Sequence, residues 1–174
     1  MQGATCVFVR LWSDNNVGAD VLKELLKPEV IRLNVSARDW EDAVRKSVQL
    51  LVDVEAAEPR YVDASVDMVR EMGAYMVIAP GLALAHARPE SGAIRNALGM
   101  ITLAAPVEFG HPDNDPVDLV LSLSAIASDE HVQLMAELAR FLLEEENLSA
   151  LHQATEVEEV LALLDETSGS ESRA

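Results

Sequence analysis

Residues 74–92, AYMVIAPGLALAHARPESG, contain the pattern that decides the fold. Two short apolar runs, 74–79 and 82–87, are separated by a Pro-Gly dipeptide, which is typical of a tight turn. A cluster of Arg, Pro, Glu, Ser and Gly follows the second run, so that run ends in a loop. The stretch therefore predicts strand, turn, strand and loop, with His86 at the end of the second strand.

The segments on either side alternate between strand and helix patterns. Period-two alternation predicts strands, and apolar residues three and four positions apart predict amphipathic helices, the second of which has Tyr61 on its apolar face. Asp39 before the first of these helices, and Thr155 with Glu158 before the last, are candidate caps. The expected elements are strands at 31–35, 74–79, 82–87, 97–103 and 119–125, and helices at about 40–57, 59–72, 128–142 and 156–164.

Composition points to one α/β domain. With 174 residues, of which 49% are apolar, the chain can bury one substantial core and is short for two domains. Aromatic residues make up only 4%, so aliphatic side chains must fill the core between layers of secondary structure, which favours an α/β arrangement over a β-sandwich. Residues 1–24 are expected to form an N-terminal extension, residues 25–165 the domain, and residues 166–174 a disordered tail.

The charge balance excludes several classes of partner. Thirteen basic residues against 30 acidic ones give a formal net charge of −17, which repels both a nucleic-acid backbone and an anionic membrane surface. The sequence therefore predicts no nucleic-acid partner and no direct membrane insertion, since no apolar run reaches the roughly 20 residues of a spanning helix. Cys6 is the single cysteine, which excludes an intrachain disulfide and fits a reducing, cytoplasmic compartment.

His86 heads the candidate functional residues. Histidine is the side chain whose ordinary pKa lies near neutrality, and small neighbours, Ala85 and Ala87, leave this imidazole approachable. Arg88 follows in the turn, where its guanidinium is able to bind phosphate oxygens in a bidentate way. A neutral imidazole nitrogen is a competent nucleophile toward phosphorus. From the residues alone, a surface histidine without a function is the competing interpretation.

The other three histidines differ in their surroundings. His131 falls in the first turn of a predicted helix, where free backbone N–H groups favour an anion. His111 lies in a loop rich in Pro, Asp and Asn, and His152 is expected on a helix surface. The chain contains no His-Glu-x-x-His, phosphate-binding glycine-rich loop or Gly-x-Ser-x-Gly motif, which argues against zinc hydrolases, nucleotide-binding proteins and serine hydrolases.

The segment from Ile78 to Glu90 resembles the active-site segment of the mannitol/fructose type of enzyme IIA, a component of the sugar phosphotransferase system. The similarity extends from Leu25 to Leu164 and is nearest to the ascorbate-specific branch. Further matching segments are LLKPE at 25–29, IRLN at 31–34, EPRYVDA at 58–64, PVEFG at 106–110, NDPV at 114–117 and SDEH at 128–131.

The resemblance implies an α/β sandwich whose mixed central sheet is flanked by helices. It also implies that His86 accepts a phosphoryl group from phospho-HPr and passes it to a cysteine of a IIB protein, with a membrane IIC permease in the same system. His131 would lie beside His86 and help to hold the phosphoryl group, and Arg88 would be a supporting cation. No metal or organic cofactor is expected, and ascorbate or a related pentitol or hexitol is the expected transported compound.

Ala85 and the N-terminal extension keep other functions open. The family usually has proline immediately before the active histidine, whereas this chain has Ala85, which would leave the backbone at His86 less constrained. One alternative is a regulatory module in which phosphorylation of His86 controls the binding of a partner protein. Another is a degenerate member that has lost transfer, against which the presence of both His86 and His131 argues. Arg70 occupies roughly the place of an arginine in mannitol-type relatives and is left outside the predicted site.

Overall fold

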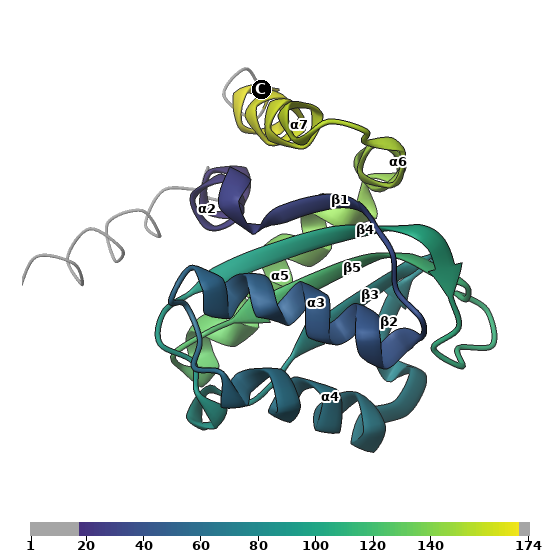
Figure 1. The fold of residues 1–174 in the computed structure, drawn as a ribbon. Helices are drawn as coiled ribbons and strands as arrows, with labels where there is room; N and C mark the ends of the chain where they lie inside the picture. Colours follow the sequence, from purple (N-terminus) through teal and green to yellow (C-terminus); the bar gives the residue numbers. More distant parts are fainter. Residues whose placement is uncertain (1–17, 171–174) are drawn as a thin grey trace, which may run out of the picture.

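A mixed five-stranded sheet forms the centre of the molecule, in the order β1-β4-β5-β3-β2 (Figure 1). The computed structural model describes residues 18–170, apart from the side chains of 18–20, 128, 130, 131 and 167–170. The strands are β1 (Ile31–Val35), β2 (Val77–Ala79), β3 (Leu82–His86), β4 (Ala97–Val107) and β5 (Val117–Ser124). β1 pairs in parallel with β4 and β3 with β5, whereas the β4–β5 and β2–β3 pairs are antiparallel. The predicted fold class is therefore confirmed.

Helices cover both faces of this sheet. In Figure 1, α3 (Trp40–Asp53) and α4 (Arg60–Met72) lie in front of the strands and α5 (Ser128–Leu143) lies behind them. In the same view α6 (Glu145–Gln153) and α7 (Val157–Ser170) are drawn above β1 and α2 (Gly18–Leu25) at its left end, and α2 packs against α7 and α5. Short 3₁₀ segments at Pro28–Val30, Gly73–Met76 and Pro89–Ser91 complete the described part of the chain. The result is one continuous aliphatic core.

Small residues let α3 approach the sheet closely. Ser47 of α3 donates its hydroxyl to Val120 O at 3.2 Å, and Ser122 of β5 donates to Ser47 O at 3.0 Å. Both serines are fully buried, so each hydroxyl replaces the hydrogen bond with water that it loses on folding. Gly99 of β4 lies opposite Ser122, and a Cβ atom there would be 2.5 Å from Ser122 Oγ. The contact between α3 and the sheet therefore has no room for a side chain at position 99.

Local chemistry sets the helix ends. Asp39 caps α3 as predicted, because its carboxylate accepts the Asp42 N–H at 2.9 Å. Gly73 ends α4 with a positive φ of 61°, a conformation that glycine adopts without strain. At α7 the predicted partner of Thr155 was wrong: Glu159, not Glu158, accepts its N–H and hydroxyl. The carboxylate that caps this helix therefore comes from the residue one position after the predicted one.

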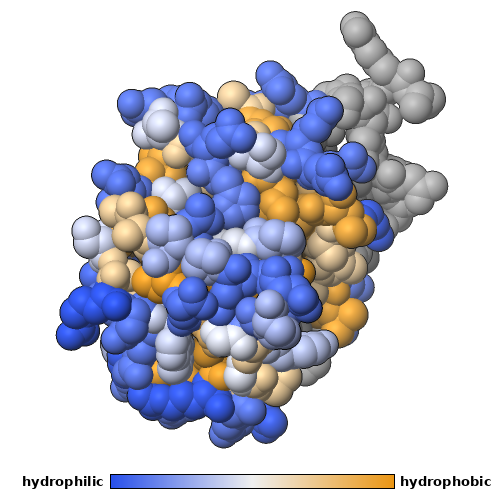
Figure 2. Space-filling model, turned by 90° about the vertical axis from the view of Figure 1, so that its right-hand side faces the viewer, coloured by the Kyte–Doolittle hydropathy of each residue, from blue (hydrophilic) through white to orange (hydrophobic). Residues whose placement is uncertain are grey.

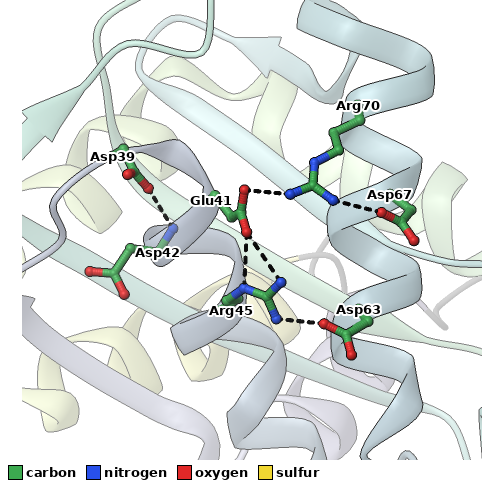
Figure 3. A network of polar contacts seen from close by, with 7 residues as sticks. All are labelled: Asp39, Glu41, Asp42, Arg45, Asp63, Asp67 and Arg70. Carbon is green, nitrogen blue, oxygen red and sulfur yellow. Dashed lines mark hydrogen bonds and ion pairs between the residues drawn. The ribbon is translucent and has the colours of Figure 1, made fainter.

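Exposed ion pairs connect α3 to α4 (Figure 3). The Arg45 guanidinium contacts Glu41 at 3.2 Å on its own helix and Asp63 of α4 at 2.7 Å. Arg70 of α4 contacts Glu41 at 2.7 Å and Asp67 at 2.8 Å. Hydrogen bonds from Asp63 and then Glu41 raise the pKa of Arg45 above its ordinary value. Water and salt compete with these pairs, because Arg70 is exposed and Arg45 and Glu41 are only partly buried, so the network orients the two helices and adds little stability.

Several predicted boundaries differ from the structure. The run 74–79 was expected to be one strand, but its first residues form the 3₁₀ segment Gly73–Met76. The chain turns at Glu144 to begin α6, which lies outside the expected helix bounds, although His152 was expected on a helix surface. α2 buries Val21 and Leu22 in the core, so the domain begins before residue 25. α7 runs to Ser170, so residues 166–170 are helical where a disordered tail was expected; residues 1–17 and 171–174 lie outside the described residues.

Polar residues dominate the molecular face shown in Figure 2, with smaller apolar areas between them. This distribution fits a chain with 30 acidic residues, whose charged side chains must remain in water. Within residues 18–170, no helix is long and apolar enough to cross a membrane.

We expect Gly99→Ala to lower the free energy of unfolding by about 1–3 kcal/mol, because the new methyl group must displace Ser122 or α3 from a packed position. Urea denaturation followed by circular dichroism measures this change. Ala104→Ser, at an exposed position of the same strand, is the matched control and should change stability by less than about 0.5 kcal/mol. A Gly99→Ala protein as stable as the control would contradict the close contact with α3.

Candidate functional site

His86 is the last residue of β3, and its side chain is half-buried. The parallel pairing of β3 with β5 places it beside Leu123. Because parallel strands end at the same edge of a sheet, the chain leaving β5 starts at the edge where His86 lies. α5 begins there, only a few residues after Ser124. The topology thus brings the end of one strand and the start of one helix together around a single histidine.

The imidazole of His86 has a defined orientation. Its Nδ1 lies 3.3 Å from the carbonyl oxygen of Leu84, two residues earlier in the same strand. A carbonyl oxygen only accepts hydrogen bonds, so Nδ1 must carry the proton in this arrangement. In the neutral ring, the lone pair is then on Nε2. Nε2 is accordingly the nitrogen with nucleophilic character.

Tyr61 holds the backbone on both sides of His86. This residue lies near the start of α4, is only 1% exposed, and directs its hydroxyl toward the end of the sheet. The hydroxyl oxygen lies 3.0 Å from Ala87 O and 2.9 Å from Leu123 O, the two carbonyls that compete for its proton. It also accepts the Ala87 N–H at 3.1 Å. The Tyr61 side chain therefore connects Ala87, which follows His86, to Leu123, which is paired with His86.

Burial keeps the Tyr61 hydroxyl protonated. Removal of the phenol from water raises its pKa above the ordinary value of 10.0, and the hydrogen bond with Ala87 offsets part of that increase. A neutral hydroxyl is required for the observed contacts, since a phenolate has no proton to give to either carbonyl. The connection is intact throughout the neutral range of pH.

His131 lies in the first turn of α5, as predicted. Its backbone therefore belongs to the helix start at the His86 edge of the sheet, where N–H groups favour an anion. Its side chain lies outside the described residues, so contact between the two imidazoles stays a prediction. Ala127 is the N-cap residue of this helix.

Basic residues occur on the loop that follows His86. Arg88 is exposed and begins the 3₁₀ segment Pro89–Ser91. Arg95, also exposed, donates to Val54 O at 2.8 Å, which anchors the loop to the chain after α3. Arg70, by contrast, lies in the last turn of α4, at the opposite end of this helix from Tyr61, and pairs with Glu41. Arg70 is thus held by contacts within α4 and with α3, and the role of Arg88 stays a prediction.

The two other histidines have structural partners. His111 Nδ1 accepts the N–H groups of Asp113 and Asn114 within the loop between β4 and β5. His152 of α6 was expected to be an ordinary surface residue, which is wrong. Its Nδ1 lies 2.7 Å from Asp118 Oδ1 and its Nε2 lies 3.2 Å from Pro80 O, so it connects α6 to the turn before β3. Both lie at the end of the sheet opposite His86.

Candidate ligand sites other than His86 are few in the described part of the chain. No cluster of three or more His, Cys, Asp or Glu residues in it is placed to hold a metal ion. A surface pocket of about 360 Å³ is lined by residues of β1, α3 and β4, among them Arg32, Lys46 and Ile101, and His86 is not part of its lining.

Comparison with known proteins decides the family. Residues 24–167 match the family model described as "Phosphoenolpyruvate-dependent sugar phosphotransferase system, EIIA 2". The chain belongs to this EIIA type 2 family. Among its relatives is the ascorbate-specific PTS system EIIA component of Escherichia coli K12, 39% identical over 147 residues, which are 84% of this chain and 96% of that protein. The EIIA fold and the resemblance drawn from the sequence are thus confirmed, and a phosphotransferase role comes with the family.

Solved structures agree with the EIIA assignment. The mannitol-specific cryptic phosphotransferase enzyme IIA of Escherichia coli superimposes with a TM-score of 0.75 at 30% identity, covering 83% of this chain and 98% of that one. The IIA protein in a complex of enzyme IIA mannitol with phosphorylated enzyme IIB mannitol, also from Escherichia coli, gives a TM-score of 0.72 at 27% identity, covering 82% and 99%.

Sequence reasoning missed the contact of Tyr61 with the backbone beside His86. The helical pattern placed it on the apolar face of α4 and treated it as core. One signal was available: a tyrosine at a core position carries a hydroxyl that must find a partner when it is buried. The identity of that partner, the backbone at residues 87 and 123, depends on tertiary contacts across 26 and 62 positions.

The raised pKa of Tyr61 predicts a specific loss of stability in alkali. The group is neutral in both states below pH 10, so its contribution is complete there, and it falls as pH rises from the ordinary tyrosine pKa of about 10 toward the higher folded value. We therefore expect the free energy of unfolding of the unsubstituted protein to decrease more steeply above pH 10 than that of Tyr61→Phe. Denaturant titrations from pH 8 to 11 measure the difference, and parallel curves would contradict the assignment.

Proposed function

We propose that this EIIA protein carries a phosphoryl group on His86, which it accepts from phospho-HPr and passes to a cysteine of a IIB protein. The observation that carries the proposal is the half-buried imidazole at the end of β3, whose Nδ1 is turned to Leu84 O. The alternative nitrogen, Nε2, then has the lone pair needed to attack phosphorus. A membrane IIC permease would complete the same system.

The chemistry is an in-line displacement in each direction. The Nε2 lone pair forms the new N–P bond while the bond from phosphorus to the HPr nitrogen breaks and its electron pair returns to HPr. In the second step the IIB thiolate forms an S–P bond, and the electron pair of the N–P bond returns to His86. Positioning and charge stabilisation suffice for such transfers, so we expect no metal and no organic cofactor.

Charge stabilisation would come from two features near His86. The first turn of α5, which contains His131, presents backbone N–H groups at the same edge of the sheet. Arg88, two residues after His86, adds an exposed guanidinium, the side chain best suited to phosphate oxygens. His131 would hold the phosphoryl group beside His86, and both roles are assigned here from position and from the family resemblance.

Exposed apolar side chains favour protein partners. Ile94, Ile126 and Val132 are 52%, 50% and 65% exposed, and they lie on the segments that follow β3 and β5 and open α5. Asn96 connects two of these segments, because its side-chain oxygen accepts the Ile126 N–H at 3.0 Å. Exposed apolar groups close to a reactive side chain are typical of a protein-binding surface. HPr and IIB would both use this surface, from the cytoplasmic side of the membrane.

Ascorbate is the transported compound that we favour, or else a related pentitol or hexitol. The relatives from Escherichia coli and from Salmonella typhimurium are both named as ascorbate-specific EIIA components, the second at 39% identity over 141 residues. A complex between a mannitol IIA relative and its phosphorylated IIB protein supports IIB as the acceptor. The choice of IIB protein, rather than a sugar pocket in this chain, would set the pathway.

We expect His86→Ala to abolish phosphorylation. The purified protein is incubated with enzyme I, HPr and radiolabelled phosphoenolpyruvate, and label that is labile in acid and stable in base is measured. His152→Ala is the matched control: it removes an imidazole at the other end of the sheet and should leave labelling intact. Label retained on a histidine of His86→Ala would show that the site assignment is wrong.

His131→Ala should still accept phosphate but transfer it onward slowly, by about 10- to 100-fold, if this imidazole stabilises the phosphoryl group in flight. Single-turnover transfer from the labelled protein to IIB gives the rate. Transfer at the unsubstituted rate would exclude His131 from the mechanism.

The choice of acceptor distinguishes transport from regulation. Transfer from the phosphorylated protein is compared for IIB proteins of the ascorbate and mannitol systems. A kcat/KM at least about tenfold higher with the ascorbate-system IIB supports the proposed pathway. Stable label on His86 that neither IIB protein removes would instead favour a regulatory module whose phosphorylation controls a binding partner.

A further inference from the structure

We propose that Tyr61 is a positioning residue for phosphoryl transfer, whose hydroxyl holds His86 in its reactive geometry. The inference rests on the proposed function of His86. Three observations carry it: the Tyr61 hydroxyl accepts the Ala87 N–H at 3.1 Å, it lies 3.0 Å from Ala87 O, and it lies 2.9 Å from Leu123 O.

The contacts act on the peptide groups that flank the end of β3. The Ala87 N–H belongs to the peptide group that begins at the carbonyl carbon of His86, so a bond to that N–H fixes the ψ angle of His86 itself. The hydroxyl proton is shared between Ala87 O, which belongs to the next peptide group, and Leu123 O. Leu123, the third partner, is paired with His86 in the parallel ladder. A single hydroxyl thus controls the backbone immediately after the histidine and ties it to β5.

This constraint matters because His86 is the terminal residue of its strand. Terminal residues of strands and helices fray readily, and a frayed residue samples several side-chain directions. The direction of the imidazole therefore depends on the backbone that carries it, beside the contact of its Nδ1 with Leu84 O at 3.3 Å. Tyr61 makes that backbone more rigid from a second element, α4, because its phenol ring is packed in the core. Misplacement of a reacting group by about 1 Å is enough to slow a reaction by about 100-fold.

The neighbouring buried hydroxyls do not share this role. Ser122 Oγ donates to Ser47 O, and Ser124 Oγ donates to Ala56 O at 3.1 Å. Both connect β5 to the segment of α3 or the chain after it, and neither contacts Ala87. Ser122→Ala is therefore a matched control for Tyr61→Phe: each removes one buried hydroxyl close to Leu123, but only the second releases the peptide group after His86.

The first test compares transfer kinetics for Tyr61→Phe, Ser122→Ala and the unsubstituted protein, at a temperature where all are folded. We expect Tyr61→Phe to lower kcat for transfer from phospho-HPr by about tenfold, with KM for phospho-HPr changed less than twofold, because the docking surface is untouched. Ser122→Ala should change neither. A kcat for Tyr61→Phe within twofold of the unsubstituted value, or an equal loss in Ser122→Ala, would overturn the inference.

The second test reads the imidazole directly and needs no partner protein. Nitrogen-15 NMR of His86 in the neutral, unphosphorylated protein should report the tautomer protonated at Nδ1, and Tyr61→Phe should shift the ring toward a mixture of tautomers. Ser122→Ala should leave the spectrum unchanged. If the unsubstituted protein takes no label at His86, the proposed function fails, while this spectrum still decides whether Tyr61 orients the ring. An unaltered tautomer in Tyr61→Phe counts against the positioning role.

A third measurement covers the case in which Tyr61→Phe does not fold. In the unsubstituted protein, the Ala87 amide lies beyond the last residue of β3, yet its bond to Tyr61 should slow its hydrogen exchange at least about 100-fold relative to the amide of exposed Arg88. Exchange as fast as that of Arg88 would show that the hydroxyl does not hold this peptide group, and would overturn the inference without any substitution.

Discussion

The parallel pairing of β3 with β5 is the constraint on which the rest of the structure depends. Five residues of each strand are in register, from Leu82 with Leu119 to His86 with Leu123. Parallel strands end at the same edge, so this ladder fixes where the chain leaves both of them. The loop with Arg88 and the start of α5 then leave the same edge, and Tyr61, a buried residue near the start of α4, contacts the backbone there. One ladder thus brings three segments that are distant in the chain to the edge of the sheet where His86 lies.

Exposed ion pairs and buried hydrogen bonds have different roles around this ladder. The guanidinium and carboxylate groups between α3 and α4 are exposed, so water and salt compete with them, and they mainly orient the two helices. The hydroxyls of Ser47, Ser122 and Tyr61 are buried, so their bonds are hard to exchange for water and cannot be broken without cost. The charged groups of this chain thus act at its surface, while the geometry of the fold depends on a few buried, neutral hydroxyl groups.

Much of the fold followed from local sequence patterns. The turn between β2 and β3, the cap at Asp39, the stop at Gly73 and the position of His86 are all properties of neighbouring residues, which is why they were predictable. Strand order, the extra helix α6 and the role of Tyr61 were not, because each depends on contacts between segments far apart in the chain. The family resemblance supplied the candidate partner of His86, which periodicity alone did not.

The loop between β4 and β5 shows how composition misleads about mobility. Residues 108–116 contain Gly, Pro, Asp and Asn, the signature of a loose surface loop. Asp115 nevertheless accepts the N–H groups of Phe109, Gly110 and His111, and the imidazole of His111 accepts two more. Asn114 O then accepts the Gly81 N–H, so the loop is fastened to the turn that starts β3. The composition of this loop makes it look suitable for the insertion of a tag or a fluorescent reporter, yet an insertion there would break the bonds that hold the turn before the His86 strand.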